Sequence, residues 1–319
     1  MSVIMVIIDG AVPEDYKECI NINKASKKGY INNIPEGFES GSLTCIMNML
    51  KVPPKFIPKG RSYLESLALD IPIDSEDLIF RCNNVNIKDK VLLGNENKTL
   101  NLEFQEGKLI SINTYKNLLV LHSKKGLIEK IKTFPPHEHF GEKIENIMPL
   151  CEDKTLEKFL RDLIREYHVF PWGESIKTPL PPFERKGAVV CSTEIVKGIA
   201  KALKMHCPHI KNATSDIDTD LYAKTEETLR LIREYEFVLL HINGADECAH
   251  RRQEEEKVNF IKKIDNVVIK NLLENLPKET SLIITSDHGT SAKTGAHLRT
   301  DVSYYVFNDS KEAEFWLKR

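Results

Sequence analysis

Short apolar runs rich in valine, leucine and isoleucine recur along the chain, and polar residues follow them directly. Residues 3–8 form the first run, which ends at Asp9-Gly10. Residues 237–242 and 282–286 repeat the pattern. Continuous apolar runs of this length are typical of strands buried on both faces, as in parallel sheets. The pattern therefore predicts three buried strands, each with polar side chains at its carboxyl end.

In the carboxyl-terminal half, apolar runs alternate with segments of helical periodicity. Further strands are predicted over residues 187–190 and 302–307. Helices are predicted over residues 192–203, from 218 or 219 to about 235, and from about 251 to 275. Alternation of this kind predicts a parallel sheet with helices on both faces.

Residues 11–40 are polar and rich in turn-forming residues. Residues 43–50 then show the periodicity of a helix. Ser42 stands directly before this helix, where a serine hydroxyl often caps the first turn.

From about residue 69 to 180 the pattern changes to short alternating runs, such as residues 78–83 and 118–122, separated by Asn and Gly turns. Such runs predict antiparallel strands, and residues 155–167 add a helix. We therefore expect a discontinuous α/β core of residues 1–68 and 181–319, into which an α+β domain of residues 69–180 is inserted.

Composition narrows the possible partners. Hydrophobic residues make up 41% of the chain and charged residues 29%, and the net charge is -2, with both signs interspersed. Nothing in this balance favours nucleic acid or an anionic membrane as a partner. No apolar run has the length of a membrane span, and the first residues lack the basic start of a signal peptide. No pattern in the sequence indicates an oligomeric state.

The 7 cysteines are scattered and include no C-x-x-C pair. This pattern argues against a disulfide framework and against a thiolate zinc site. A reducing cytoplasmic location is expected.

Acidic and histidine residues gather at the predicted carboxyl ends of the strands. Asp246 and His250 are four residues apart, so one helical turn places both on the same face. Each residue alone has an ordinary alternative, because an Asp at a strand end often caps a helix and a lone His is often packed or exposed. The combination favours a site for two divalent ions, which clamp phosphoryl oxygens and lower the pKa of a hydroxyl nucleophile. The candidate ligands are Asp9, Asp246, His250, Asp287, His288 and His297.

Motifs in matching order over nearly the whole chain resemble those of the archaeal-type, cofactor-independent phosphoglycerate mutases, which belong to the alkaline phosphatase superfamily. The resemblance implies an alkaline-phosphatase-like core with a smaller inserted domain that covers the substrate. The matching segments are Asp9-Gly10, Gly41-Ser42, Gly60-Arg61, residues 80–83, Pro135-Pro136-His137, residues 186–189, Asp218-Thr219-Asp220, Asp246-Glu247 with His250, and Asp287-His288 with His297.

The resemblance also implies roles for individual residues. Ser42 matches the nucleophile that takes up the phosphoryl group. Asp9, Ser42, Asp287 and His288 match the ligands of one metal, and Asp246, His250 and His297 match the ligands of the other. Manganese is the implied metal, with magnesium, cobalt or zinc as alternatives. Without the resemblance, a helix cap would be the preferred role for Ser42.

Cationic residues are candidates for binding a phosphate or carboxylate of the small phosphorylated substrate. Arg61, Arg81 and Lys186 are the candidates, and the alternative for each is an ordinary solvated charge. His137, next to two prolines, is a further candidate from the inserted domain.

Four departures from the family pattern affect the substrate pocket more than the metal site, and one is a shorter segment between Gly10 and Gly41. Leu43 replaces an acid after the serine, Lys116-Asn117 replace an Arg-His pair, and Arg251-Arg252 follow His250. The first hypothesis is a mutase that interconverts 3- and 2-phosphoglycerate through a phosphoserine. The second is a phosphatase or phosphotransferase for another small phosphoester, and the third is a non-catalytic binding protein on the same scaffold.

Overall fold

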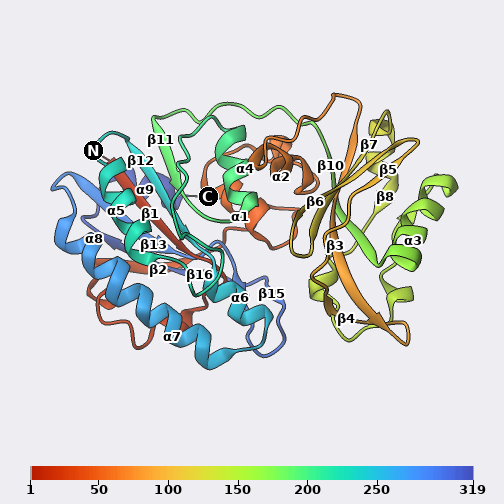
Figure 1. Cartoon of the computed structure of the whole chain (residues 1–319). Coiled ribbons are helices and arrows are strands. Elements are labelled where there is room, and N and C mark those ends of the chain that lie inside the picture. The colour runs from red at the N-terminus through yellow and green to blue at the C-terminus, as the bar shows by residue number, and fades with distance from the viewer. Residues whose placement is uncertain (1, 319) are drawn as a thin grey trace. The chain divides into compact units, whose positions relative to one another are not determined.

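The computed structural model describes residues 2–318, and the chain divides into two compact units (Figure 1). The first unit contains the chain up to Ile57 and from Leu180 onward, and the second is Pro58–Pro179. The expected boundary after residue 68 differs from this division. Helix α2 (Ser62–Ala68) belongs to the second unit, because it packs there against β3 (Leu78–Lys88) and β10 (Val169–Ile176).

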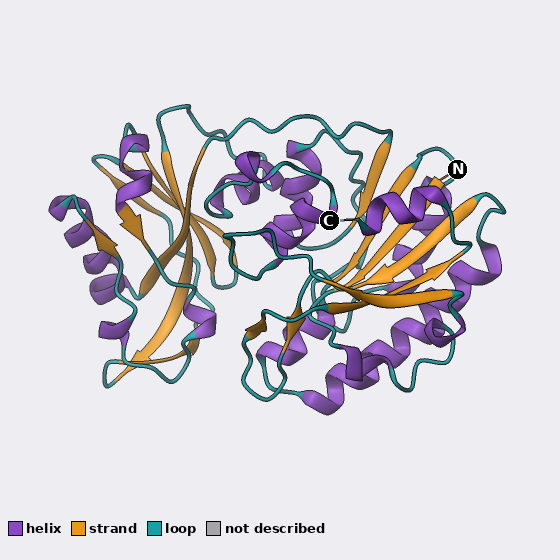
Figure 2. Ribbon diagram, turned by 180° about the vertical axis from the view of Figure 1, so that it is seen from behind, coloured by secondary structure: helices purple, strands orange, loops and turns teal. Residues whose placement is uncertain are grey.

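A six-stranded mixed sheet forms the centre of the first unit (Figure 2). The first four strands in its order are parallel, as the alternating pattern predicts, and β16 and β2 complete one edge. In spatial order the strands are β11 (Gly187–Val190), β12 (Phe237–Ile242), β1 (Ser2–Ile8), β13 (Thr280–Thr285), β16 (Val302–Phe307) and β2 (Lys27–Ile31).

Strand β16 runs antiparallel to β13, whereas the alternating pattern predicted a parallel strand. The connection between them contains only the short strands β14 (Gly289–Thr290) and β15 (His297–Leu298), with no crossover helix. A parallel strand needs a long crossover, so the chain returns in the opposite direction.

Helices cover both faces of this sheet (Figure 2). Ile4, Val6 and Ile8 of β1 share a core with α5, α7 and α8, whereas Trp316 of α9 packs on Phe237 from the other face. The predicted long helix is α7 and α8 joined by a π-helical turn at Asp265–Ile269. The helices are α1 (Ser42–Met49), α4 (Glu194–Ala202), α5 (Leu221–Leu231), α6 (Gly244–His250), α7 (Glu254–Ile264), α8 (Lys270–Asn275) and α9 (Lys311–Leu317).

The second unit contains an antiparallel sheet in the order β10-β3-β7-β6-β5, with β4 paired to β3. Leu160 and Leu163 of helix α3 (Lys154–Tyr167) pack on Phe80 and Leu119 of this sheet. The remaining strands are β4 (Val91–Asn95), β5 (Leu102–Phe104), β6 (Gly107–Asn113), β7 (Lys116–Leu121), β8 (Ile131–Lys132) and β9 (Leu150–Cys151).

Short 3₁₀ helices complete both units, at Pro13–Tyr16, Ile22–Lys24, Pro54–Phe56, Lys125–Lys130, Pro136–Glu138 and Ile144–Asn146. Within residues 2–318, every helix is too short or too polar to cross a bilayer.

Candidate metal centre

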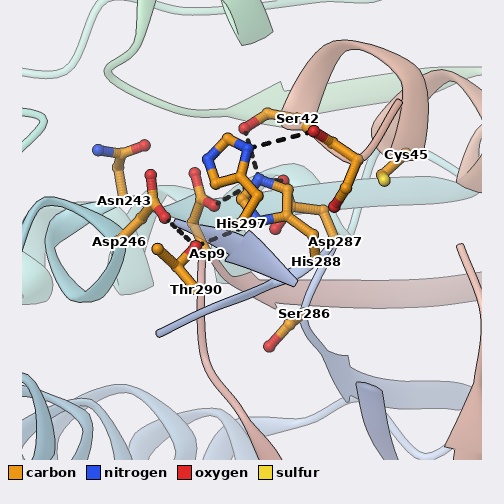
Figure 3. A network of polar contacts seen from close by, with 12 residues as sticks. Asp9, Ser42, Cys45, Asn243, Asp246, Ser286, Asp287, His288, Thr290 and His297 are labelled. Atoms are coloured by element: carbon orange, nitrogen blue, oxygen red, sulfur yellow. Dashed lines mark hydrogen bonds and ion pairs between the residues drawn. The ribbon is translucent and has the colours of Figure 1, made fainter. Parts of the chain in front are cut away.

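The carboxyl ends of three adjacent strands in the first unit bring together acidic and histidine side chains (Figure 3). Asp9 follows β1, and Asp287 and His288 follow β13. Helix α6 starts just after β12 and carries two more candidate ligands, and the β14–β15 hairpin carries a third. These three are Asp246, His250 and His297.

Asp9, Asp287 and His288 form one group, with one ligand atom from each lying within 4.8 Å of the others. All three residues are buried. The Nε2 atom of His288 lies 3.6 Å from Oδ1 of Asp9 and 3.5 Å from Oδ2 of Asp287. The Oγ atom of Ser42 lies 3.3 Å from the same Nε2. The candidate nucleophile therefore adjoins the first group.

Asp246, His250 and His297 form a second group that satisfies the same 4.8 Å criterion. The Nε2 atom of His250 lies 3.2 Å from Oδ2 of Asp246 and 3.2 Å from Nε2 of His297. The Nδ1 atom of His250 lies 2.8 Å from the carbonyl oxygen of Gly295, and Nδ1 of His297 lies 3.1 Å from that of Ser40. A carbonyl only accepts, so both rings carry their proton on Nδ1 and direct Nε2 into the group.

Thr290 connects the two groups. Its hydroxyl donates to Oδ1 of Asp246 at 2.5 Å, and its oxygen lies 3.3 Å from Nδ1 of His288. With its own proton directed to Asp246, the threonine oxygen accepts from Nδ1–H of His288. This tautomer leaves Nε2 of His288 facing Asp9, Asp287 and Ser42.

Burial and charge shift the pKa values of these groups in opposite directions. Burial raises the pKa of Asp9 well above its ordinary value, and the charges of Asp287 and Asp246 add to the effect. Burial alone would also raise the pKa of Asp246, but the charge and hydrogen bond of His250 hold it well below its ordinary value. Burial would lower the pKa of His250, but Asp246 raises it to about 9.

The ligand atoms that converge in each group fit divalent cations. All four carboxylate oxygens of Asp9 and Asp287 are buried and accept no hydrogen bond. In the second group, Nε2 of His250 lies 3.2 Å from both Oδ2 of Asp246 and Nε2 of His297, so three potential ligand atoms converge. A divalent cation fits both arrangements, because carboxylate oxygens and imidazole nitrogens are its ordinary ligands. The donor sets therefore suit divalent metal ions.

Ser42 does not cap its own helix. It is the first residue of α1, Gly41 occupies the cap position, and no side-chain capping bond is present there. The Ser42 hydroxyl faces His288 instead. The hydroxyl of Ser40, two residues earlier, donates instead to the Leu298 carbonyl at 3.0 Å. The capping role considered for Ser42 is therefore wrong.

Three of the predicted anion-binding residues surround Trp172 in the second unit. The guanidinium carbons of Arg61 and Arg81 lie 5.2 Å and 6.0 Å from the Trp172 ring centre, and the His137 ring lies 5.0 Å from it. The buried Glu65 pairs with Arg61 at 2.8 Å and with Arg81 at 3.1 Å. One carboxylate facing two guanidinium groups leaves an excess of positive charge.

Lys186 lies elsewhere. It directly precedes β11, so it sits at the amino end of a strand whose carboxyl end faces the metal groups. Its exposed side chain places Nζ 4.9 Å from the ring centre of Tyr235. This placement does not support the predicted role of Lys186 in binding substrate.

Sequence reasoning missed several residues of these clusters. His241 interrupts the apolar run of β12, and its Nε2 lies 3.2 Å from Oδ2 of Asp9. Burial lowers the pKa of His241 to about 4, so this imidazole is neutral at physiological pH. A histidine within a buried strand was a detectable signal. Thr290, Glu65 and Trp172 gave no such signal, because their partners are distant in the chain.

Known proteins resemble the chain over almost its whole length. A family model described as the metalloenzyme superfamily matches residues 1–318. The 2,3-bisphosphoglycerate-independent phosphoglycerate mutase 2 of Methanothermobacter thermautotrophicus is 23% identical, and the alignment covers 96% of this chain and 86% of that protein. The 2,3-bisphosphoglycerate-independent phosphoglycerate mutase of Methanococcus aeolicus is 26% identical, with 97% and 89% covered.

Two solved structures share the fold. The PH0037 protein from Pyrococcus horikoshii aligns with a TM-score of 0.69 at 20% identity, covering 96% of this chain and 87% of that one. The cofactor-independent phosphoglycerate mutase from Thermoplasma acidophilum aligns with a TM-score of 0.53 at 19% identity, covering 97% and 90%. The expected α/β fold class is thus confirmed.

Proposed function

This chain belongs to the metalloenzyme superfamily, and from that premise we propose that it is a phosphoglycerate mutase interconverting 3- and 2-phosphoglycerate. The observation that carries the proposal is the Ser42 hydroxyl, 3.3 Å from His288 and beside the unpaired carboxylates of Asp9 and Asp287. The mutases of Methanothermobacter thermautotrophicus and Methanococcus aeolicus support the choice of reaction.

Two divalent ions, for which we propose manganese, would be held by the two groups. Asp9, Ser42, Asp287 and His288 would hold one, and Asp246, His250 and His297 the other. When bound, such ions lower the pKa of a serine hydroxyl and stabilise the charge on phosphoryl oxygens.

The proposed reaction uses Ser42 twice. Its Oγ attacks phosphorus, the bond from Oγ to phosphorus forms, and the bond from phosphorus to the 3-oxygen breaks. The proton lost by Ser42 ends on that 3-oxygen. The 2-hydroxyl of glycerate then attacks the phosphoserine, the bond to Oγ breaks, and the proton of the 2-hydroxyl returns to Ser42. Phosphorus thus moves between two oxygens of one molecule with no net gain or loss of atoms.

The arginine cluster of the second unit is the proposed binding site for an anionic group of the substrate. Arg81 is 4% exposed and already paired with Glu65, so it holds that carboxylate in place. The Arg61 side chain retains 31% exposure and stacks on Trp172, so its remaining donors are available to a planar carboxylate. His137, on the same ring, is a further proposed contact.

An assay with 3-phosphoglycerate and manganese tests the proposal, with enolase coupling to detect 2-phosphoglycerate and a separate assay for free phosphate. We expect 2-phosphoglycerate without phosphate release. Ser42→Ala should lower turnover by on the order of 10³-fold or more, because it removes the proposed nucleophile. Phosphate release without isomerisation would instead identify a phosphatase.

Ser40→Ala is the matched control for that variant. Its hydroxyl bonds only the Leu298 carbonyl among the described contacts, so most activity should remain. If both serine variants lose the same fraction of activity, Ser42 is not the nucleophile.

A further inference from the structure

Two cysteines of the first unit form a thiol pair outside the metal groups. All 7 cysteines are free in the described chain, and Cys207 alone among them is not fully buried. The Sγ atoms of Cys191 and Cys207 lie 3.7 Å apart, which is the distance of a hydrogen bond between thiols.

The backbone on both sides of the pair is fixed. Cys191 directly follows β11, and the chain returns through α4 to lie beside that strand. His206 pairs with β11, because the N–H of Val189 donates to the His206 carbonyl at 2.7 Å and the N–H of His206 donates to that of Gly187 at 3.0 Å. Cys207 is the next residue, so the two thiols meet across adjacent backbone segments.

The surroundings shift the pKa values of the two thiols in opposite directions. The hydrogen bond from Cys191 lowers the pKa of the Cys207 thiol, and Lys197 and Lys201 of α4 lower it further. The same hydrogen bond and burial raise the pKa of Cys191 well above its ordinary value. The shifts therefore favour the thiolate at Cys207, the partly exposed residue of the pair, with a protonated thiol beside it.

We propose that Cys207 and Cys191 form a peroxide-oxidisable dithiol, in which Cys207 attacks the oxidant and Cys191 resolves the product to a disulfide. The Cys207 thiolate attacks one oxygen of hydrogen peroxide, the O–O bond breaks, and hydroxide leaves with a sulfenic acid on Cys207. The Cys191 sulfur then attacks the Cys207 sulfur, an S–S bond forms, and the sulfenic oxygen leaves as water. Two electrons pass from the dithiol to one peroxide.

Peptide mapping of the full-length protein tests the proposal. Reduced protein is treated with hydrogen peroxide in slight excess, quenched with N-ethylmaleimide and analysed by mass spectrometry. We expect two of the 7 thiols to disappear and one cross-link to join Cys191 to Cys207. The melting temperature should rise on oxidation and return on treatment with dithiothreitol, because the disulfide closes a loop around α4.

Two serine variants separate the roles of the sulfurs. In Cys191→Ser, Cys207 should accumulate a sulfenic acid that dimedone traps, and no cross-link should form. In Cys207→Ser, all six remaining thiols should survive the same treatment. Circular dichroism melting establishes that both variants are folded.

Cys151→Ser is the matched control, because Cys151 is a buried thiol of the second unit. It should show the same cross-link as the parent. The proposal is overturned if the parent keeps all 7 thiols, if the cross-link joins other cysteines, or if Cys207→Ser loses thiols at the parent rate.

Discussion

A single hydroxyl links the two halves of the candidate metal centre. Thr290 can donate only one proton, and its 2.5 Å contact to Asp246 uses it. The contact with His288 must then be an acceptor contact, which fixes the proton of that ring on Nδ1. The orientation of one ligand in each group therefore depends on the same side chain.

Thr290→Val should weaken manganese binding by about 10- to 100-fold, the usual cost of removing a hydrogen bond that orients a metal ligand. Valine keeps the shape of threonine but neither donates to Asp246 nor accepts from His288. Isothermal titration of metal-free protein measures the effect, and Thr290→Ser should retain most of the affinity.

Thr285→Val provides the control for burial. Thr285 is equally buried, at the end of β13, but its hydroxyl donates to the Ser303 carbonyl at 2.9 Å. This variant should lose stability without losing affinity for manganese. Equal losses of affinity in the two valine variants would contradict the positioning role of Thr290.

The sequence predicts the site residues that directly follow a strand better than the site residues that act through contacts with other strands. Asp9, Asp287 and His288 could be placed because an apolar run marks where each strand ends. Thr290 and His241 act through contacts whose partners depend on how the strands are ordered in the sheet. Strand order is set by the packing of the whole unit, so no local pattern identifies these partners, although His241 itself interrupts an apolar run.

At the scale of elements, the helix that crosses one face of the sheet has an interruption that periodicity does not reveal. The predicted helix over about residues 251–275 contains a π-helical turn at Asp265–Ile269. The Asp265 carboxylate, which is buried, accepts the backbone N–H groups of Asn21 at 3.0 Å and Ile22 at 2.8 Å. This turn thus anchors the irregular segment that follows β1.

Asp265→Ala should lower the free energy of unfolding by about 2–4 kcal/mol, because it leaves two buried N–H groups without acceptors. Urea denaturation measures the change. Asp309→Ala is the comparison, since Asp309 pairs with Lys27 at 3.2 Å where both side chains are more than one third exposed. That variant should lose less than about 1 kcal/mol. If the two alanine variants lose equal stability, Asp265 is not an anchor.

The elements that the sequence did not reveal are those with weak local patterns. Strand β2 lies in the turn-rich residues 11–40 and alternates between exposed and half-buried positions along most of its length. It forms an edge of the sheet, where only β16 pairs with it. Edge strands lack the continuous apolar run that marks buried ones, so the sequence pattern does not predict β2.

At the scale of the whole molecule, unsatisfied charge is concentrated in the first unit. The carboxylates of Asp9 and Asp287 are buried without hydrogen-bond donors, and burial together with the charge of Asp287 raises the pKa of Asp9. Buried ionised groups cost free energy unless a counter-charge is present. Stability of the fold should therefore depend on bound cations, whatever the substrate.

Removing metal should lower the melting temperature, and adding manganese should restore it in a concentration-dependent manner. A ligand that binds only the folded state stabilises it by about 2.7 kcal/mol at one hundred times its dissociation constant. Dialysis against EDTA followed by differential scanning calorimetry measures the change, and elemental analysis counts the ions. We expect two ions per chain in the parent and one in Asp246→Asn, because Asp246 is a ligand candidate of the group with His250 and His297 and not of the other group. An unchanged melting temperature in EDTA, together with less than one ion per chain after equilibration with manganese, would contradict a metal centre at this edge of the sheet.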